Sequence, residues 1–206
     1  MSMRLQSGIV VLALSMLALG AALAGCGGKQ VTRIDPNETV DLSGRWNDTD
    51  SRLVAEEMIG DCLGKPWLVA FSQSKGKNPT IIAGSIRNKS LEHIPVGTFL
   101  KDIERAMVNS AAVQVVASAE EREEVRDERS DQRVNASPET LKRMGMEMGA
   151  DFMLIGEINQ INDSEGGKSV RYYQTDLTLV NVETNVKTWI GQKKIKKFVA
   201  NSKYKG

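Results

Sequence analysis

Apolar residues recur at helical spacing in the stretch GRWNDTDSRLVAEEMIGDC. Its residues Val54, Met58 and Cys62 follow one another at i, i+4 spacing, which places them on one face of a helix. Asp50 stands before this run and is predicted to be the N-cap, because its carboxylate can accept free backbone N–H groups of the first turn. We therefore expect the folded domain to open with an amphipathic helix.

Three further stretches carry helix signals. Thr98 is predicted to cap a helix whose apolar stripe consists of Phe99, Ile103 and Met107. Ser118 and Glu121 form the S-x-x-E pattern of a capping box, which predicts that a helix begins between them. The tripeptide SPE (137–139) is predicted to begin the last helix, which Gly149 ends. Its inward-facing residues are predicted to be Leu141, Met144 and Met148.

β-Branched and apolar runs predict strands. TIIAGSIRN (80–88) is predicted to be a central strand and VQVV (113–116) a short one. Three more strands are predicted in DFMLIGEINQI, VRYYQTDLTLVNV and VKTWIGQKKIKKF, joined by the hairpin loops NDSEGG and ETN. The run WLVAF leaves two interpretations open: a buried strand, or a short helix that begins at Pro66.

Together these elements predict a mixed α/β (α+β) fold. Helices and strands in this order indicate a central, mostly antiparallel sheet of about four to five strands that is flanked by helices. The three consecutive strands at the end of the chain predict a C-terminal β-meander. We find no internal repeat and no low-complexity tract.

The N-terminus has the pattern of a lipoprotein signal peptide. The apolar run Ile9–Ala24 would form a helix about 24 Å long, shorter than the hydrocarbon core of a bilayer, which is about 30 Å thick. Arg4 precedes this run, as in a secretory signal, and LAGC (23–26) at its end matches the bacterial lipobox. Cys26 is therefore predicted to be a lipid anchor and, after cleavage, the first residue. The alternative is an uncleaved helix with an incidental cysteine.

Three parts are predicted along the chain: a signal peptide (1–25), a lipidated N-terminus with a short tether (26–43) and a globular domain (44–206). The tether is polar, lacks helical or strand periodicity and extends to at most about 55 Å. The chain has 27 Lys and Arg residues against 26 Asp and Glu residues. This near-neutral balance argues against nucleic acid as a main partner.

Candidates for catalysis or metal binding are few. His93 is the only histidine, so a histidine cluster cannot form, and it is predicted to be a structural residue. GGKS (166–169) lacks the first glycine of a phosphate-binding P-loop and joins two strands, so it is predicted to be a turn. Cys62 is predicted to be a buried hydrophobe, with pairing between chains as the alternative. We expect no metal, no cofactor, no small-molecule substrate and no enzymatic activity.

Two charged segments allow more than one interpretation. The stretch Ala119–Arg133 carries charges of both signs and is predicted to be a solvated helix with internal salt bridges, with a docking surface as the alternative. The C-terminal stretch KKIKKFVANSKYKG is basic. Its lysines either protect an edge strand from pairing or meet anionic headgroups or wall polymers.

Four blocks of the sequence, in order, resemble penicillin-binding-protein activators of the LpoB type. They are GRWNDTDSRLVAEEMI, IIAGSIRNKSLEHI, SPETLKRMGMEMGADFMLIGEI and LTLVNVETNVKTWIG, and they lie within residues 44–197. The LpoB family is also similar to the curli-secretion lipoprotein CsgG and to the N-terminal domain of TolB. The resemblance implies a sheet flanked by helices and no enzymatic activity.

The resemblance further implies an outer-membrane lipoprotein that faces the periplasm and stimulates a class A penicillin-binding protein by protein–protein contact. Gly27 occupies the position where an aspartate would signal retention in the inner membrane, which favours the outer membrane. A structural or transport subunit of an envelope secretion or assembly complex, similar to CsgG, is the alternative from another functional class.

Arg45, Trp46 and Asn88 lie in the resembling blocks and are the candidate partner-binding residues. Tryptophan and arginine are enriched at binding hot spots, although core packing is the other role open to Trp46. The chain departs from the family in two places. Thr184-Asn185 replaces the common T-G-E turn, which asparagine permits because it tolerates the left-handed conformation. The tether is also shorter than the proline-rich tether of well-known activators.

Overall fold

The computed structural model describes residues 30–137, 139 and 147–200. The chain divides into two compact units, Met1–Glu38 and Thr39–Gly206. Within the first unit, the described residues 30–38 form no helix or strand. All helices and strands that the structure describes belong to the second unit.

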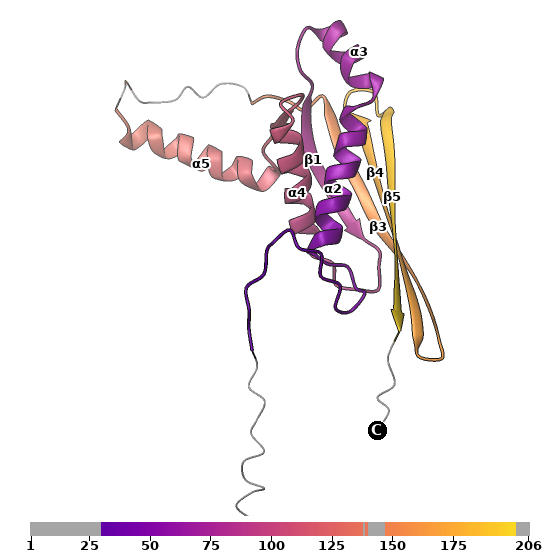
Figure 1. Cartoon of the computed structure of the whole chain (residues 1–206). Coiled ribbons are helices and arrows are strands. Elements are labelled where there is room, and N and C mark those ends of the chain that lie inside the picture. Colours follow the sequence, from indigo (N-terminus) through magenta and orange to yellow (C-terminus); the bar gives the residue numbers. More distant parts are fainter. Residues whose placement is uncertain (1–29, 138, 140–146, 201–206) are drawn as a thin grey trace, which may run out of the picture. The chain divides into compact units, whose positions relative to one another are not determined.

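A five-stranded mixed sheet with helices on one face forms the second unit (Figure 1). The strands are β1 (Thr80–Asn88), β2 (Gln114–Val116), β3 (Phe152–Glu165), β4 (Lys168–Asn181) and β5 (Lys187–Ala200). Their order is β2-β1-β3-β4-β5; β1 is parallel to β2 and β3, and β3, β4 and β5 form an antiparallel meander. The helices are α2 (Asp48–Leu63), α3 (Pro66–Lys75), α4 (Val96–Asn109) and α5 (Ala119–Asn135). This architecture confirms the predicted mixed α+β fold and its C-terminal meander.

The first two predicted N-caps are each wrong by three residues. Asn47 caps α2: its side chain accepts the Asp50 backbone N–H, and the Asp50 carboxylate accepts the Asn47 N–H in return. Asp50 is therefore the third residue of a capping box and not the cap. α4 begins two residues before Thr98, after Pro95, which makes no side-chain cap bond. The fixed φ of proline, −74° here, directs the chain into the helix.

The run WLVAF belongs to helix α3, so the strand interpretation is wrong. Pro66 stands at its first position, and Gly76 ends it in the left-handed conformation with φ 65°. One side of the helix packs on the sheet, because the rings of Trp67 and Phe71 lie edge-on to Phe152 at centroid distances of 5.1 and 5.3 Å. This contact explains the apolar run.

Helix α5 is solvated, as predicted. Ser118 and Glu121 form the expected capping box, and none of its residues is buried. The ion pairs described for α5 join it to other segments and are not the predicted pairs within the helix. Glu121 pairs with Lys101 of α4 at 2.6 Å, and Arg126 pairs with Glu147 at 2.7 Å. These ion pairs are exposed and contribute little to stability.

The hairpin between β3 and β4 is longer than predicted. The strands continue through most of NDSEGG, and Gly166-Gly167 alone form the turn, with φ of 57° and 80°. Two successive positive φ angles are typical of the tight turn that suits a twisted hairpin. The two glycines of GGKS thus form a turn, as predicted, whereas Lys168 and Ser169 already belong to β4. Asn185 adopts the expected left-handed conformation with φ 61°.

Most of the helix predicted over residues 137–149 lies outside the described residues, including Leu141 and Met144. Met148 is described and is 56% exposed, so it does not face inward as predicted. Its sulfur accepts a hydrogen bond from the Thr80 hydroxyl at 3.4 Å. VQVV forms a strand only from Gln114 onward.

The core lies between the sheet and helices α2 and α4. Alternate residues of β4, from Tyr173 to Leu179, are buried against the apolar faces of both helices. The predicted stripes of α2 and α4 all belong to this core: Val54, Met58, Cys62, Phe99, Ile103 and Met107. The helical periodicity therefore identified the inward faces correctly.

Cys62 is a free, fully buried thiol, as the hydrophobe interpretation predicts. Burial, together with the neighbouring Asp61 carboxylate, raises the pKa of this thiol to about 12. At pH 8 the folded chain should thus keep Cys62 protonated and enclosed, and thiolates are the reactive form. In a Cys26→Ala variant, a thiol reagent should label Cys62 only after denaturant is added. Labelling of the folded chain at the rate of a free cysteine would contradict this burial.

The chain enters the folded unit beside the end of β5. The Lys197 ammonium donates to Asp41 Oδ1 at 2.5 Å, to Asp50 Oδ2 at 2.6 Å and to the Arg45 carbonyl at 3.2 Å. Lys197 and Asp50 are almost buried, with side chains 10% and 7% exposed. Asp41, which sequence analysis assigned to the tether, is therefore held against the sheet.

Candidate functional site

The sheet face opposite α2 and α4, here called the open face, is the candidate functional site. Residue alternation along β4 defines it: the odd-numbered positions from 173 to 179 are buried against the helices, and the even-numbered ones are half-buried. Cross-strand register brings β3, β4 and β5 side chains together in rows. The rows are Ile155–Thr178–Ile190, Glu157–Asp176–Gln192, Asn159–Gln174–Lys194 and Ile161–Tyr172–Lys196.

Two carboxylates lie directly opposite each other on the open face. Glu157 of β3 pairs in register with Asp176 of β4, and like charges in this position destabilise a sheet. Glu157 forms an ion pair with Lys89 at 2.6 Å, and that bond is the main cause that lowers the pKa of Glu157. Asp176 accepts amide hydrogen bonds from Gln174 and Gln192, each at 2.8 Å. No cation among the described residues lies within ion-pair distance of Asp176.

A shallow groove of about 340 Å³ lies around this carboxylate pair. Its lining residues are Ser85, Arg87, Ile155, Gly156, Glu157, Asp176, Thr178 and Lys187. The register between β1 and β3 shifts between Ala83 and Ile86, which lets the neighbouring strand contribute to the groove. Anionic groups in the middle and cationic groups at the border suit a polar or charged side chain of a partner.

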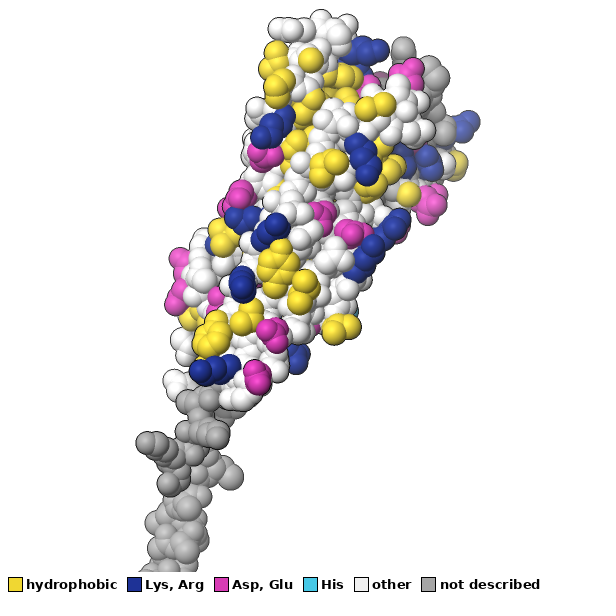
Figure 2. Space-filling view, turned by 90° about the vertical axis from the view of Figure 1, so that its right-hand side faces the viewer, with side chains coloured by type: hydrophobic (Ala, Val, Ile, Leu, Met, Phe, Trp, Pro, Cys, Tyr) yellow, Lys and Arg dark blue, Asp and Glu magenta, His cyan; other side chains and the backbone are white. Residues whose placement is uncertain are grey.

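Exposed apolar side chains complete the open face. Ile161 and Phe198 are each 65% exposed and Ile190 is 61% exposed. Figure 2 shows the side that carries β4 and β5, where hydrophobic side chains are interspersed with Lys, Arg, Asp and Glu. These side chains can supply apolar contact area to a partner protein.

A second cluster, on the helix side, is centred on Glu92. Its carboxylate accepts hydrogen bonds from the Tyr173 hydroxyl at 2.8 Å and from Gln160 Nε2 at 2.7 Å. It also pairs with Arg171 at 3.1 Å and accepts the Trp46 backbone N–H at 3.4 Å. Burial, together with the Glu92 carboxylate, raises the pKa of Tyr173 to about 12, so the hydroxyl remains a donor. This cluster fixes the loop before α4 to the sheet.

The described residues offer neither a metal site nor a membrane-spanning helix. Within residues 30–137, 139 and 147–200, no three His, Cys, Asp or Glu side chains are placed to hold a metal ion. Across the same part of the chain, no helix combines the length and apolar character needed to cross a bilayer.

Residues 50–195 match the family model of the peptidoglycan-synthase activator LpoB. The chain belongs to the LpoB family. The match begins at the third residue of α2, includes α3 to α5 and β1 to β4, and ends within β5. No curated protein matches this LpoB-family chain significantly.

Solved structures of LpoB domains and of another lipoprotein are similar to this LpoB-family chain. The LpoB C-terminal domain from Escherichia coli is 14% identical, with coverage of 72% of this chain and 99% of that one and a TM-score of 0.40. The NMR structure of E. coli LpoB is 13% identical, with 84% coverage of both chains and a TM-score of 0.41. Lipoprotein GNA1162 from Neisseria meningitidis is 20% identical, covering 61% of this chain and 88% of that one, with a TM-score of 0.38.

The predicted site residues of this LpoB-family chain do not lie together on the open face. Trp46 packs edge-on against Phe99 and Tyr173 on the helix side, at centroid distances of 6.0 and 5.6 Å. Arg45 is exposed beside it. The Asn88 side chain is exposed but donates to the Glu92 carbonyl at 2.7 Å and so shapes the following loop. The partner-binding role of these three residues stays a prediction, and Cys26 lies outside the described residues.

Sequence reasoning missed both clusters. Nothing in the pattern of the loop SLEHIP singled out Glu92, whereas His93, which drew attention as the only histidine, is exposed and not part of the core. Glu157 and Asp176 were overlooked because each stands in a strand-like run of mixed polarity. Their opposition depends on the hairpin register, which the sequence analysis left undefined when it assigned NDSEGG to a loop.

Proposed function

We propose that this LpoB-family chain is an outer-membrane lipoprotein that activates a class A penicillin-binding protein by direct contact. Family membership over residues 50–195 is the observation that carries the proposal. The chain would have no catalytic role of its own. A bound activator raises enzyme activity when it binds the active conformation more tightly than the inactive one, so contact alone suffices.

The proposed anchor is the Cys26 sulfur. Residues 1–25 would be removed as a signal peptide, and Gly27 favours sorting to the outer membrane, with the folded unit in the periplasm. The folded unit begins at Thr39, so the linker from Cys26 to it extends to at most about 45 Å. The periplasmic part of the synthase would therefore have to come within the combined reach of this linker and the folded unit.

The open face is the proposed contact surface. Asp176 has amide partners but no cation among the described residues, and Glu157 lies directly opposite. A basic side chain from the synthase would relieve this repulsion, which makes the contact both favourable and selective. The exposed Ile190 beside the groove would supply apolar contact area.

Affinity capture and reconstitution test the proposed function. Capture of the intact lipoprotein from detergent-solubilised envelopes should recover a class A penicillin-binding protein. Addition of the mature chain to that purified synthase should then raise the rate of glycan-chain polymerisation. Reproducible capture of other envelope proteins without a synthase, together with an unchanged polymerisation rate, would refute the proposal.

A further inference from the structure

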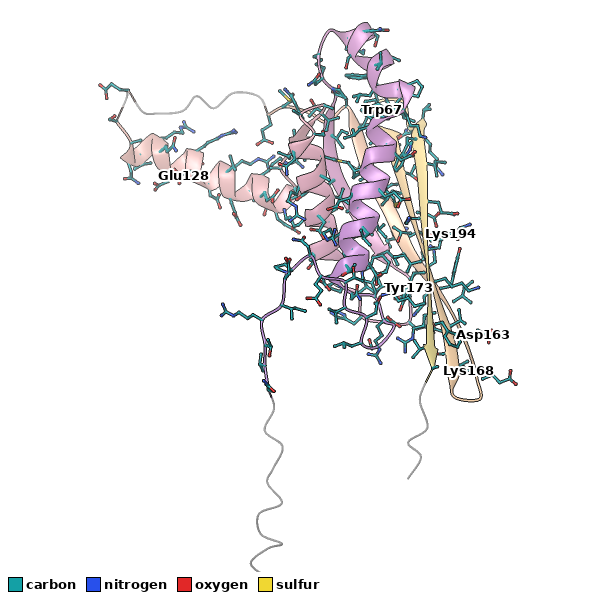
Figure 3. The ribbon with its side chains drawn as sticks, in the orientation of Figure 1. Trp67, Glu128, Asp163, Lys168, Tyr173 and Lys194 are labelled. Carbon is teal, nitrogen blue, oxygen red and sulfur yellow. The ribbon has the colours of Figure 1, made fainter. Side chains whose placement is uncertain are left out.

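Lysines on β5 divide between the two faces of the sheet. Lys193 and Lys197 point toward the helices, and each is paired with carboxylates of α2 or of the segment before it. Lys194 and Lys196 lie on the open face, are exposed and have no ion-pair partner within the described part of the chain. Figure 3 shows Lys194 extending from β5 on the side away from α2. Two positive charges on this face are thus uncompensated.

Apolar side chains lie next to these two lysines. Cross-strand register places Ile161 and Tyr172 in the same row as Lys196, and Phe198 is the next outward residue on β5. Ile161 and Phe198 are each 65% exposed. We call these five residues the basic platform: Ile161, Tyr172, Lys194, Lys196 and Phe198.

The basic platform lies at the end of the unit where the chain enters it. Lys197, between Lys196 and Phe198, binds Asp41 near the start of the folded unit. Asp41 and Leu42 share a groove of about 430 Å³ with the last residues of β5. The polypeptide that leads to the proposed anchor at Cys26 therefore leaves the unit beside the platform.

We propose that the basic platform docks on the anionic surface of a phospholipid bilayer. Lysines attract anionic headgroups, and aromatic and aliphatic side chains beside them can enter the headgroup region. A second copy of β5 is a poorer occupant, because it would bring lysines close to lysines. Asp163 shares the row of Phe198 but stands on β3, two strands away, so the β5 side of the platform would lie closest to the lipid.

The carboxylate groove lies on the same sheet face as the platform, and its row Glu157–Asp176–Gln192 is the next row after that of Lys194. Along β3, Glu157 lies four residues from Ile161, which corresponds to about 13 Å. The chain would therefore bind the bilayer with one part of the open face and the synthase with another. This inference does not depend on the identity of the synthase.

Vesicle sedimentation tests the docking surface. The mature chain with Cys26→Ala, which cannot be acylated there, should sediment with vesicles that contain phosphatidylglycerol, and less at high salt. Lys196→Glu should weaken this binding by about tenfold, because it reverses a charge at an anionic surface. Phe198→Ser should weaken it severalfold.

Matched variants on α3 are the controls. Lys75→Glu and Val69→Ser change exposed residues of the same types on another element and should leave vesicle binding unchanged. Thermal unfolding would verify that all four variants are folded. The proposal would be overturned if the chain bound pure phosphatidylcholine vesicles as well as those with phosphatidylglycerol, or if the α3 variants weakened vesicle binding as much as the β5 variants. It would also be overturned if the β5 variants lost binding to isolated peptidoglycan but kept their binding to vesicles.

Discussion

Replacement of Lys197 by alanine is expected to lower the free energy of unfolding by about 3–5 kcal/mol. Its ammonium lies between Asp41 and Asp50, and the Asp50 side chain is only 7% exposed. Burial raises the pKa of Asp50, and the Lys197 hydrogen bond opposes that shift. Without the lysine, a buried carboxylate would be left without a cation.

The effect of Lys197→Ala should depend on pH in one direction. A raised pKa in the folded state means that Asp50 favours folding when it is protonated and opposes folding as the pH rises through that pKa. The loss of stability should therefore be larger at pH 7 than at acidic pH. Urea unfolding followed by circular dichroism at both pH values measures it.

Lys193→Ala is the matched control for Lys197→Ala. It stands on the same strand and faces the same side, but its partner Glu57 is 60% exposed. Exposed ion pairs contribute about 1 kcal/mol or less, so this variant should lose little. Equal losses in the two variants would show that burial of the Lys197 cluster does not stabilise the fold.

Replacement of Gly156 by alanine is expected to destabilise the sheet by about 1–3 kcal/mol or more. A Cβ atom here would lie 2.4 Å from Leu177 Cδ2 and 2.6 Å from the Asp176 carbonyl oxygen. The carbonyl belongs to the next strand and cannot rotate away as a side chain can. The variant should thus also displace Asp176 and weaken synthase binding.

Gly97→Ala controls for the general effect of alanine in place of glycine. A Cβ at Gly97 in α4 would meet nothing within 4 Å, and alanine favours helix over glycine. Its stability should be equal to that of the parent or slightly higher. If Gly156→Ala unfolds at the same urea concentration as the parent, the claim that β3 and β4 approach too closely here for a Cβ atom is contradicted.

Helical periodicity predicted the inward faces of α2 and α4, because burial requires apolar residues at fixed spacing. The exact start of α2 was not predicted, since Asn47 and Asp50 are both good caps and only the reciprocal capping box assigns their roles. WLVAF was ambiguous because a short apolar run fits either a strand or a half-buried helix. The contact of Trp67 with Phe152 favours the helix, and the sequence could not predict it because the two residues meet only in the tertiary structure.

The candidate site was less predictable than the fold. The two-residue turn Gly166-Gly167 fixes the register that places Glu157 opposite Asp176. If this turn had been recognised in the sequence, pairing the residues on either side of it one by one would have placed Glu157 opposite Asp176. The Glu92 cluster offers no such route, because its members come from separate strands and loops that meet only in the folded unit.

The affinity of the mature chain for a purified class A penicillin-binding protein tests the central claim most directly. If the open face is the contact surface, Asp176→Lys should weaken binding by about thirtyfold or more, corresponding to about 2 kcal/mol, because like charges would then meet. Lys75→Glu, a charge reversal on α3, should bind as the parent does. Equal affinity of Asp176→Lys and the parent would contradict the account.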